Sequence, residues 1–174
     1  MKDGTTRQFA PGSLVRIHEW YGCKKDQSNV GLKMLAEEIA AGIKEREKFF
    51  PFNVSSGPAD SSIFDTVNGM CIADDMKREG ISWTKADKSP GSRVNGAELI
   101  RTMLKASLTY PMESPGLFTF SHCRDFIDLM PIMPRDEKNS EDVDTEAEDH
   151  IWDECRYRVM MPIYKGSKAR LAAH

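Results

Sequence analysis

The sequence has no apolar run approaching the roughly 20 residues that a membrane-spanning helix needs. Its first residues, Met1 to Gly4, show no hydrophobic segment of the kind found in secretory signals. The four cysteines are widely spaced and form no CxxC pair, which favours free thiols over disulfides or a zinc site. Together these absences predict a cytosolic protein with no membrane partner.

Motifs that mark several common enzyme classes are also missing. No glycine-rich segment matches a phosphate-binding loop or a dinucleotide-binding fingerprint. No serine or cysteine has the sequence context of a recognised nucleophile. What is present is an ordinary composition, with 40% hydrophobic and 29% charged residues, which fits one globular domain over residues 1–174.

Negative charge is concentrated near the C-terminus. Residues 136–154 contain ten acidic residues and one basic residue, whereas the rest of the chain has 23 basic and 17 acidic side chains, a net charge of +6. A mildly basic body would attract phosphate, and an acidic strip can attract a divalent metal ion, although a solvated acidic loop is the alternative. Residues 131–147 predict a long acidic loop, within which we expect residues 134–146 to be mobile.

The hydrophobic pattern alternates between the periods of strands and helices. The expected strands or extended segments cover residues 13–21, 51–55, 81–83 and 117–120, and the expected helices cover residues 28–48, 63–78, 95–108, 123–129 and 146–160. This order predicts an α/β fold with a mixed central sheet flanked by helices.

Two acidic positions are candidates for chemistry. Asp60 follows an extended segment and precedes a helix, which is where open α/β sheets bind ligands, although an aspartate there is also a typical helix N-cap. Asp149 and Asp153 are four residues apart and share one helical face, so their repulsion favours a compensating cation. The alternatives are a favourable interaction with the helix dipole and a simple ion pair between Asp153 and Arg156.

A polar basic loop lies between the third expected strand and the next helix. Lys88 and Arg93 in this loop can contact phosphate groups, and a solvated turn is the competing interpretation.

The joint order of these segments resembles the C-terminal nuclease domain of phage terminase large subunits. The resemblance covers about residues 12 to 160 and rests on residues 18–22 (HEWYG), 57–62 (GPADSS), 81–83 (ISW), Lys88, 91–96 (GSRVNG), 133–136 (MPRD) and 148–157 (EDHIWDECRY). Each motif is short, and their order along the chain is what makes the resemblance specific.

This resemblance implies a ribonuclease-H-like fold in which aspartates hold Mg²⁺ or Mn²⁺. On the matching positions the catalytic and metal-binding residues are Asp60 and Asp153, with Asp149 as the alternative one helical turn away, while Lys88 and Arg93 face the DNA backbone. The implied activity is metal-dependent cleavage of double-stranded DNA during phage DNA packaging. The implied partners are DNA, the portal protein and the small terminase subunit, in the cytoplasm of the bacterial host.

The family's first catalytic aspartate lies on a strand upstream of the one matched by residues 13–21. We therefore expect a ribonuclease-H-like fold that lacks its first strand, with weak metal affinity and slow or no DNA cleavage. The strand edge left at residues 13–21 favours pairing with a second copy of the chain. Two alternatives stay open: a non-catalytic module that binds DNA or the portal, and an unrelated small α/β protein with a solvated acidic strip.

Overall fold

The computed structural model describes residues 8–24, 27–137, 142–144 and 149–162. The helices are α1 (Ala36–Glu47), α2 (Ile72–Arg78), α3 (Ser92–Ala106), α4 (Arg124–Leu129) and α5 (His150–Met160), with short 3₁₀ helices η1 (Ser61–Phe64) and η2 (Met130–Ile132). The strands are β1 (Leu14–Arg16), β2 (Cys23–Lys24), β3 (Gln27–Gly31), β4 (Gly57–Ala59), β5 (Trp83–Lys85) and β6 (Leu117–Thr119). The predicted α/β class is confirmed at this level.

The described strands pair two by two, and the single mixed sheet that we expected is not formed among them. β1 pairs with β6 and β4 pairs with β5, both in parallel, while β2 pairs with β3 in antiparallel fashion. β1 ends at Arg16, so it is shorter than the strand predicted over residues 13–21. Its only strand partner in the described part of the chain is β6, which agrees with the predicted edge position.

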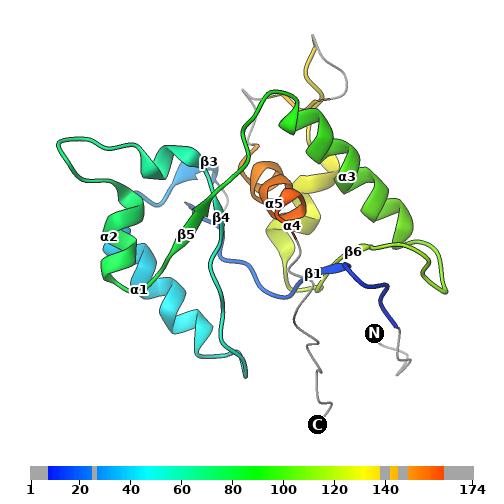
Figure 1. The fold of residues 1–174 in the computed structure, drawn as a ribbon, viewed down its shortest axis with the longest axis horizontal. Coiled ribbons are helices and arrows are strands. Elements are labelled where there is room, and N and C mark those ends of the chain that lie inside the picture. Colours follow the sequence, from blue (N-terminus) through cyan, green and yellow to red (C-terminus); the bar gives the residue numbers. More distant parts are fainter. Residues whose placement is uncertain (1–7, 25–26, 138–141, 145–148, 163–174) are drawn as a thin grey trace.

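Two clusters of buried apolar side chains hold these elements together. The larger contains Ala97, Ile100, Met103, Leu117, Phe126, Val143, Ile151, Trp152 and Cys155, and the smaller contains Ala40, Met76 and Ile81. In Figure 1, α1, α2 and β5 form one lobe, and α3, α4, α5, β1 and β6 form the other. α5 packs against both α3 and β4, so the last described helix joins the two lobes.

Helix α3 packs on α5 through a narrow stripe of small and apolar side chains. Gly96, Ala97, Ile100 and Met103 are buried, and their steps of one, three and three residues keep them on one face. A Cβ atom on Gly96 would lie only 2.4 Å from Cγ of Arg156 on α5. The two helices therefore approach each other as closely as they do because residue 96 has no side chain.

Two predicted helices differ from the observed ones. Residues 27–31 form β3, and α1 begins only at Ala36, where the Glu38 carboxylate accepts a hydrogen bond from the backbone N–H of Leu35. The helix predicted over residues 63–78 is interrupted by a turn in which Asn68 and Gly69 have positive φ, with Val67 and Met70 paired across it. Helices α3, α4 and α5 each begin within four residues of the predicted start.

The acidic segment is anchored where the structure describes it. The backbone N–H of Asp136 donates to the carbonyl of Asp142, and that of Asp144 donates to the carbonyl of Pro134. Val143 between them is only 6% exposed and belongs to the larger core cluster. Residues 138–141 and 145–148, which complete the predicted acidic loop, lie outside the described residues, and the prediction of mobility stays a prediction.

None of the helices in the described ranges combines the length and the apolar character that crossing a bilayer requires. All four cysteines are free, as the sequence predicts. Burial raises the pKa of the Cys155 thiol to about 12, so this group is a poor nucleophile at neutral pH.

Candidate functional site

Asp60 lies at the carboxyl end of β4 and also caps the 3₁₀ helix that follows. Its Oδ1 accepts a hydrogen bond of 2.8 Å from the backbone N–H of Ser62. Its Oδ2 faces the other way and lies 2.7 Å from Nζ of Lys88 and 2.6 Å from the hydroxyl of Tyr157. The two interpretations of Asp60, a helix cap and a strand-end functional group, are therefore compatible, because each uses a different oxygen.

Asp153 reaches the same point from α5. Its Oδ1 accepts from Nε and Nη2 of Arg156 at 3.0 and 2.9 Å, and from Nη1 of Arg93 at 3.3 Å. Its Oδ2 lies 2.9 Å from the Tyr157 hydroxyl. Arg156 is only 1% exposed, so this is a buried ion pair at the centre of the α3–α5 contact.

The carboxylates of Asp60 and Asp153 thus converge on the hydroxyl oxygen of Tyr157, whereas the sequence predicted that they meet at a shared metal ion. Tyr157 is four residues after Asp153 on the same helical face and is itself buried, which fixes its hydroxyl between the two carboxylates. A phenol has one proton to donate, so it can satisfy one carboxylate at a time. The hydroxyl carries no charge, and the cationic partners of the two carboxylates are Lys88 for Asp60 and Arg156 for Asp153.

Asp149 takes a different position from Asp153. It immediately precedes α5, its backbone carbonyl accepts from the N–H of Asp153, and its Oδ2 lies 3.7 Å from Nη1 of Arg93. Burial and the neighbouring Asp153 raise the pKa of Asp149. Among the three predicted aspartates, Asp60 and Asp153 form the pair, and Asp149 belongs to the surroundings of Arg93.

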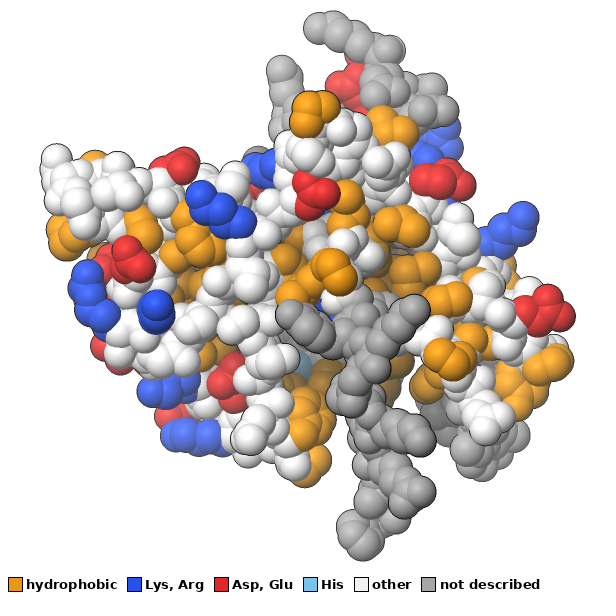
Figure 2. Space-filling model, in the orientation of Figure 1, with side chains coloured by type: hydrophobic (Ala, Val, Ile, Leu, Met, Phe, Trp, Pro, Cys, Tyr) orange, Lys and Arg blue, Asp and Glu red, His pale blue; other side chains and the backbone are white. Residues whose placement is uncertain are grey.

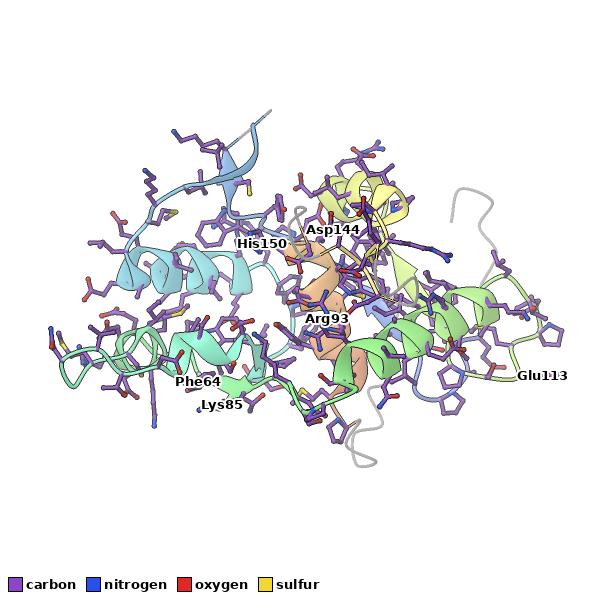
Figure 3. All side chains as sticks on the ribbon, turned by 90° about the horizontal axis from the view of Figure 1, so that it is seen from above. Phe64, Lys85, Arg93, Glu113, Asp144 and His150 are labelled. Carbon is purple, nitrogen blue, oxygen red and sulfur yellow. The ribbon has the colours of Figure 1, made fainter. Side chains whose placement is uncertain are left out.

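The two predicted DNA-binding side chains are not equivalent. Lys88 has a 43% exposed side chain and pairs with Asp60, so its ammonium group lies at the surface beside the carboxylates. Arg93 is 28% exposed and is turned towards α5 and the acidic segment, as Figure 3 shows. On the face drawn in Figure 2, Lys and Arg side chains are interspersed with Asp and Glu side chains.

Opposing influences act on the pKa of Asp60. Burial raises this pKa, but hydrogen bonds from Lys88, Tyr157 and Ser62 outweigh the effect and hold the pKa well below its ordinary value. Burial together with the two adjacent carboxylates raises the pKa of Tyr157 above its ordinary value. At neutral pH the arrangement therefore consists of an ionised Asp60 and a neutral phenol.

The lowered pKa of Asp60 predicts a pH dependence of stability. Because the folded pKa lies below the unfolded value of about 3.9, ionised Asp60 stabilises the fold above that value and loses this contribution as the pH falls. The difference in unfolding free energy between the wild type and Asp60→Asn should shrink between roughly pH 5 and pH 2. Urea unfolding at a series of pH values measures it, and a constant difference across this range would contradict the prediction.

A divalent metal ion fits the donor set only in part. Mg²⁺ commonly binds through one or two carboxylates, with water and substrate phosphate completing its coordination, and Asp60 and Asp153 supply two carboxylates facing one point. Within the described residues, no group of three or more His, Cys, Asp or Glu side chains is arranged to hold a metal ion. The pair therefore suits a weakly bound ion with a mostly non-protein coordination sphere.

Two acidic residues elsewhere in the structure have other roles. Glu19 accepts hydrogen bonds from the backbone N–H groups of Asp125 and Phe126 and so caps α4. Glu154 forms an ion pair with Arg16. Both border a cavity of about 440 Å³ between the segment around Trp20 and the start of α5, but neither carboxylate points to the Asp60–Asp153 pair.

Sequence reasoning missed two residues of the site. The spacing of four places Tyr157 on the same helical face as Asp153, but nothing in the sequence indicates that its hydroxyl also meets Asp60. Asp142 was one of ten acidic residues in the strip, and nothing in the sequence separates it from its neighbours. Its contact with Arg93 depends on pairing between segments that are 49 positions apart.

Comparisons with known proteins leave the family open. No protein-family model, curated protein or solved structure matches the chain. The resemblance to terminase nuclease domains thus rests on the order of the short motifs alone.

Proposed function

We propose that this chain is a metal-dependent DNA endonuclease module of the terminase type, with reduced activity. One observation carries the proposal: Asp60 and Asp153, from segments far apart in the sequence, place their carboxylates within 2.9 Å of the same hydroxyl oxygen. Two carboxylates that face one point are typical of a cation site, and here Lys88 and Arg156 are the cationic partners of Asp60 and Asp153.

Asp60 and Asp153 would hold the Mg²⁺ or Mn²⁺ ion. When bound, such an ion activates a water molecule and stabilises charge on a phosphodiester. The two-carboxylate donor set supports our expectation of weak metal affinity and slow cleavage.

The other side chains of the site orient these two carboxylates. Arg156 and Arg93 both bind Oδ1 of Asp153, which leaves Oδ2 directed at the Tyr157 hydroxyl. Tyr157 bridges the two aspartates and keeps them close despite their like charge. Lys88 lies at the exposed side of Asp60, where its ammonium group can contact a phosphate of the substrate.

The substrate and partners follow from the family resemblance. Double-stranded DNA is the proposed substrate, the portal protein and the small terminase subunit are the proposed partners, and the bacterial cytoplasm is the proposed location. Homodimerisation through the open edge of β1 belongs to the same proposal, supported by the single strand partner of β1 in the described part of the chain.

The decisive variant is Asp60→Asn. We expect it to lower Mn²⁺-dependent nicking of supercoiled plasmid DNA by about two orders of magnitude or more, since it removes one of two carboxylates and keeps the side-chain shape. Asp65→Asn is the matched control, because Asp65 is exposed and lies at the other end of the same 3₁₀ helix. Binding of Mn²⁺ alone, followed by electron paramagnetic resonance, should weaken only in Asp60→Asn.

Equal nicking by both variants, with equal Mn²⁺ binding, would show that the pair is not a catalytic metal site. Asp60 suits this test better than Asp153 because its side chain is 34% exposed and its removal leaves no buried cation unpaired. Circular dichroism and thermal unfolding of each variant verify that the fold is retained.

A second candidate function is a non-catalytic module that binds DNA or the portal. The lack of a third acidic ligand near Asp60 and Asp153, within the residues that the structure describes, favours it. A chain that binds a DNA duplex but neither nicks DNA nor binds Mn²⁺ would support this alternative over the nuclease.

A further inference from the structure

The guanidinium group of Arg93 is surrounded by acceptors from two other segments. Its Nε donates to Oδ2 of Asp142 at 2.7 Å, and its Nη2 lies 3.4 Å from the carbonyl of Val143. Its Nη1 lies 3.3 Å from Asp153 and 3.7 Å from Asp149. Arg93 thus combines a position beside the Asp60–Asp153 pair with a planar set of donors, and such donors bind carboxylates and phosphates in the same way.

The contact from Asp142 is built into the fold. Val143 is buried in the larger core cluster, and backbone hydrogen bonds link Asp136 with Asp142 and Pro134 with Asp144. Oδ1 of Asp142 also accepts from the N–H of Val143 at 2.7 Å, which orients Oδ2 towards Arg93. The carboxylate is therefore held against the guanidinium by its own backbone.

Charge balance around Arg93 does not require Asp142. Asp142, Asp149 and Asp153 surround Arg93, and Arg156 is the other arginine that binds Asp153. Three carboxylates therefore share two guanidinium groups, and burial first and the neighbouring Asp153 second raise the pKa of Asp149. If the Asp142 side chain rotated away, Arg93 would still have Asp149 and Asp153 as ion-pair partners.

We propose that Arg93 is a phosphate-binding position for the DNA backbone and that Asp142 occupies this position as an internal substitute for the phosphate. The inference rests on the proposed function, since it assigns the substrate contact of the same site. Binding of DNA exchanges the Asp142 carboxylate for a phosphodiester, so Asp142 weakens DNA binding in the wild type. Lys88 is more exposed than Arg93 and is paired with Asp60.

The test measures binding of a fluorescently labelled 20-base-pair duplex, without divalent metal, between 50 and 200 mM salt. Asp142→Asn should bind about threefold to fivefold more tightly at 50 mM salt, and the slope of log K against log salt should steepen by about one, because Asp142 no longer neutralises Arg93 before DNA binds. Arg93→Gln alone should weaken binding, because it removes the guanidinium that receives the phosphodiester in exchange for Asp142.

Glu137→Gln is the matched control. It removes one negative charge from an exposed residue of the same segment, which does not contact Arg93 among the described interactions. If general repulsion of DNA causes the gain, Glu137→Gln and Asp142→Asn will show the same gain and the same slope, which overturns the proposal. The double variant Asp142→Asn with Arg93→Gln should lose the gain, and persistence of the gain without Arg93 overturns the proposal as well.

This measurement is independent of cleavage. A gain specific to Asp142→Asn in a protein that does not nick DNA would support the Arg93 position and contradict the nuclease. If the protein nicks DNA but Asp142→Asn does not change its DNA affinity, the nuclease proposal is supported and the Arg93 proposal is contradicted. Thermal unfolding of the variants verifies that each is folded under the binding conditions.

Discussion

Replacing Asp153 by alanine should lower the free energy of unfolding by about 3–5 kcal/mol. The Arg156 side chain is 1% exposed, and Asp153 accepts hydrogen bonds from two of its nitrogens. Without Asp153, its nearest recorded acceptor is the carbonyl of Asp87 at 3.5 Å, so a buried cation is left almost uncompensated. Urea denaturation followed by circular dichroism measures the loss.

Asp149→Ala provides the control for this change. Its side chain is 16% exposed, close to the 18% of Asp153, and it also lies near Arg93. Asp149 makes no side-chain hydrogen bond that caps α5, and its pKa is raised, so its ionised form is disfavoured in the fold. Its removal should change the unfolding free energy by less than about 1 kcal/mol, and equal losses for the two variants would contradict the central role of the Asp153–Arg156 pair.

The buried ion pair between Asp153 and Arg156 can also be removed as a whole. Asp153→Ala combined with Arg156→Met should recover a large part of the lost stability, because an apolar side chain of similar length needs no partner in the α3–α5 contact. The double variant should still lack nuclease activity. The double variant therefore separates the contribution of Asp153 to the free energy of unfolding from its contribution to nicking, whereas Asp153→Ala alone changes both.

Gly96→Ala should destabilise the fold by about 1–3 kcal/mol, against the usual gain from replacing a helical glycine with alanine. The added Cβ would lie 2.4 Å from Cγ and 3.0 Å from Cδ of Arg156, and 3.1 Å from the sulfur of Met160. Arg156 cannot move aside easily, because its stem is buried and its head is bound to Asp153. Thermal and urea unfolding report the effect.

Asn95→Ala is the neighbouring control, since residue 95 is exposed on the same helix. Alanine has the higher helix propensity, so this variant should be neutral or slightly stabilising. If Gly96→Ala matched it, α3 and α5 would not be in the close contact described above. Because Arg156 also orients Asp153, we expect Gly96→Ala to reduce nicking activity more than its effect on stability alone explains.

The helical part of the fold is largely readable from the sequence, because it depends on contacts within a few turns. The apolar stripe of α3 and the acidic start of α5 lie close to where periodicity places them. The break at Asn68–Gly69 has a local cause as well: an asparagine–glycine pair favours positive φ, and this signal outweighed the helical pattern around it.

The pairing of strands is not readable in the same way. β1 and β6 are about 100 positions apart, and neither has a sequence feature that selects the other. The helix expected over residues 28–48 begins only at Ala36 for a related reason, because residues 27–31 form β3, which pairs with β2. Within the site, the sequence predicted that Asp60 and Asp153 meet, but not that Asp142 binds Arg93, since that contact depends on the burial of Val143.

The position of α5 as the last described helix has a consequence during synthesis. A chain that ends before residue 150 already contains Asp60, Lys88 and Arg93, but it has neither Asp153 nor the hydroxyl of Tyr157. The carboxylate pair can therefore assemble only after α5 has been synthesised and has docked between the two lobes. A nascent chain that lacks α5 therefore has Asp60, Lys88 and Arg93 but no partner carboxylate for Asp60, so the arrangement is completed by the last described helix.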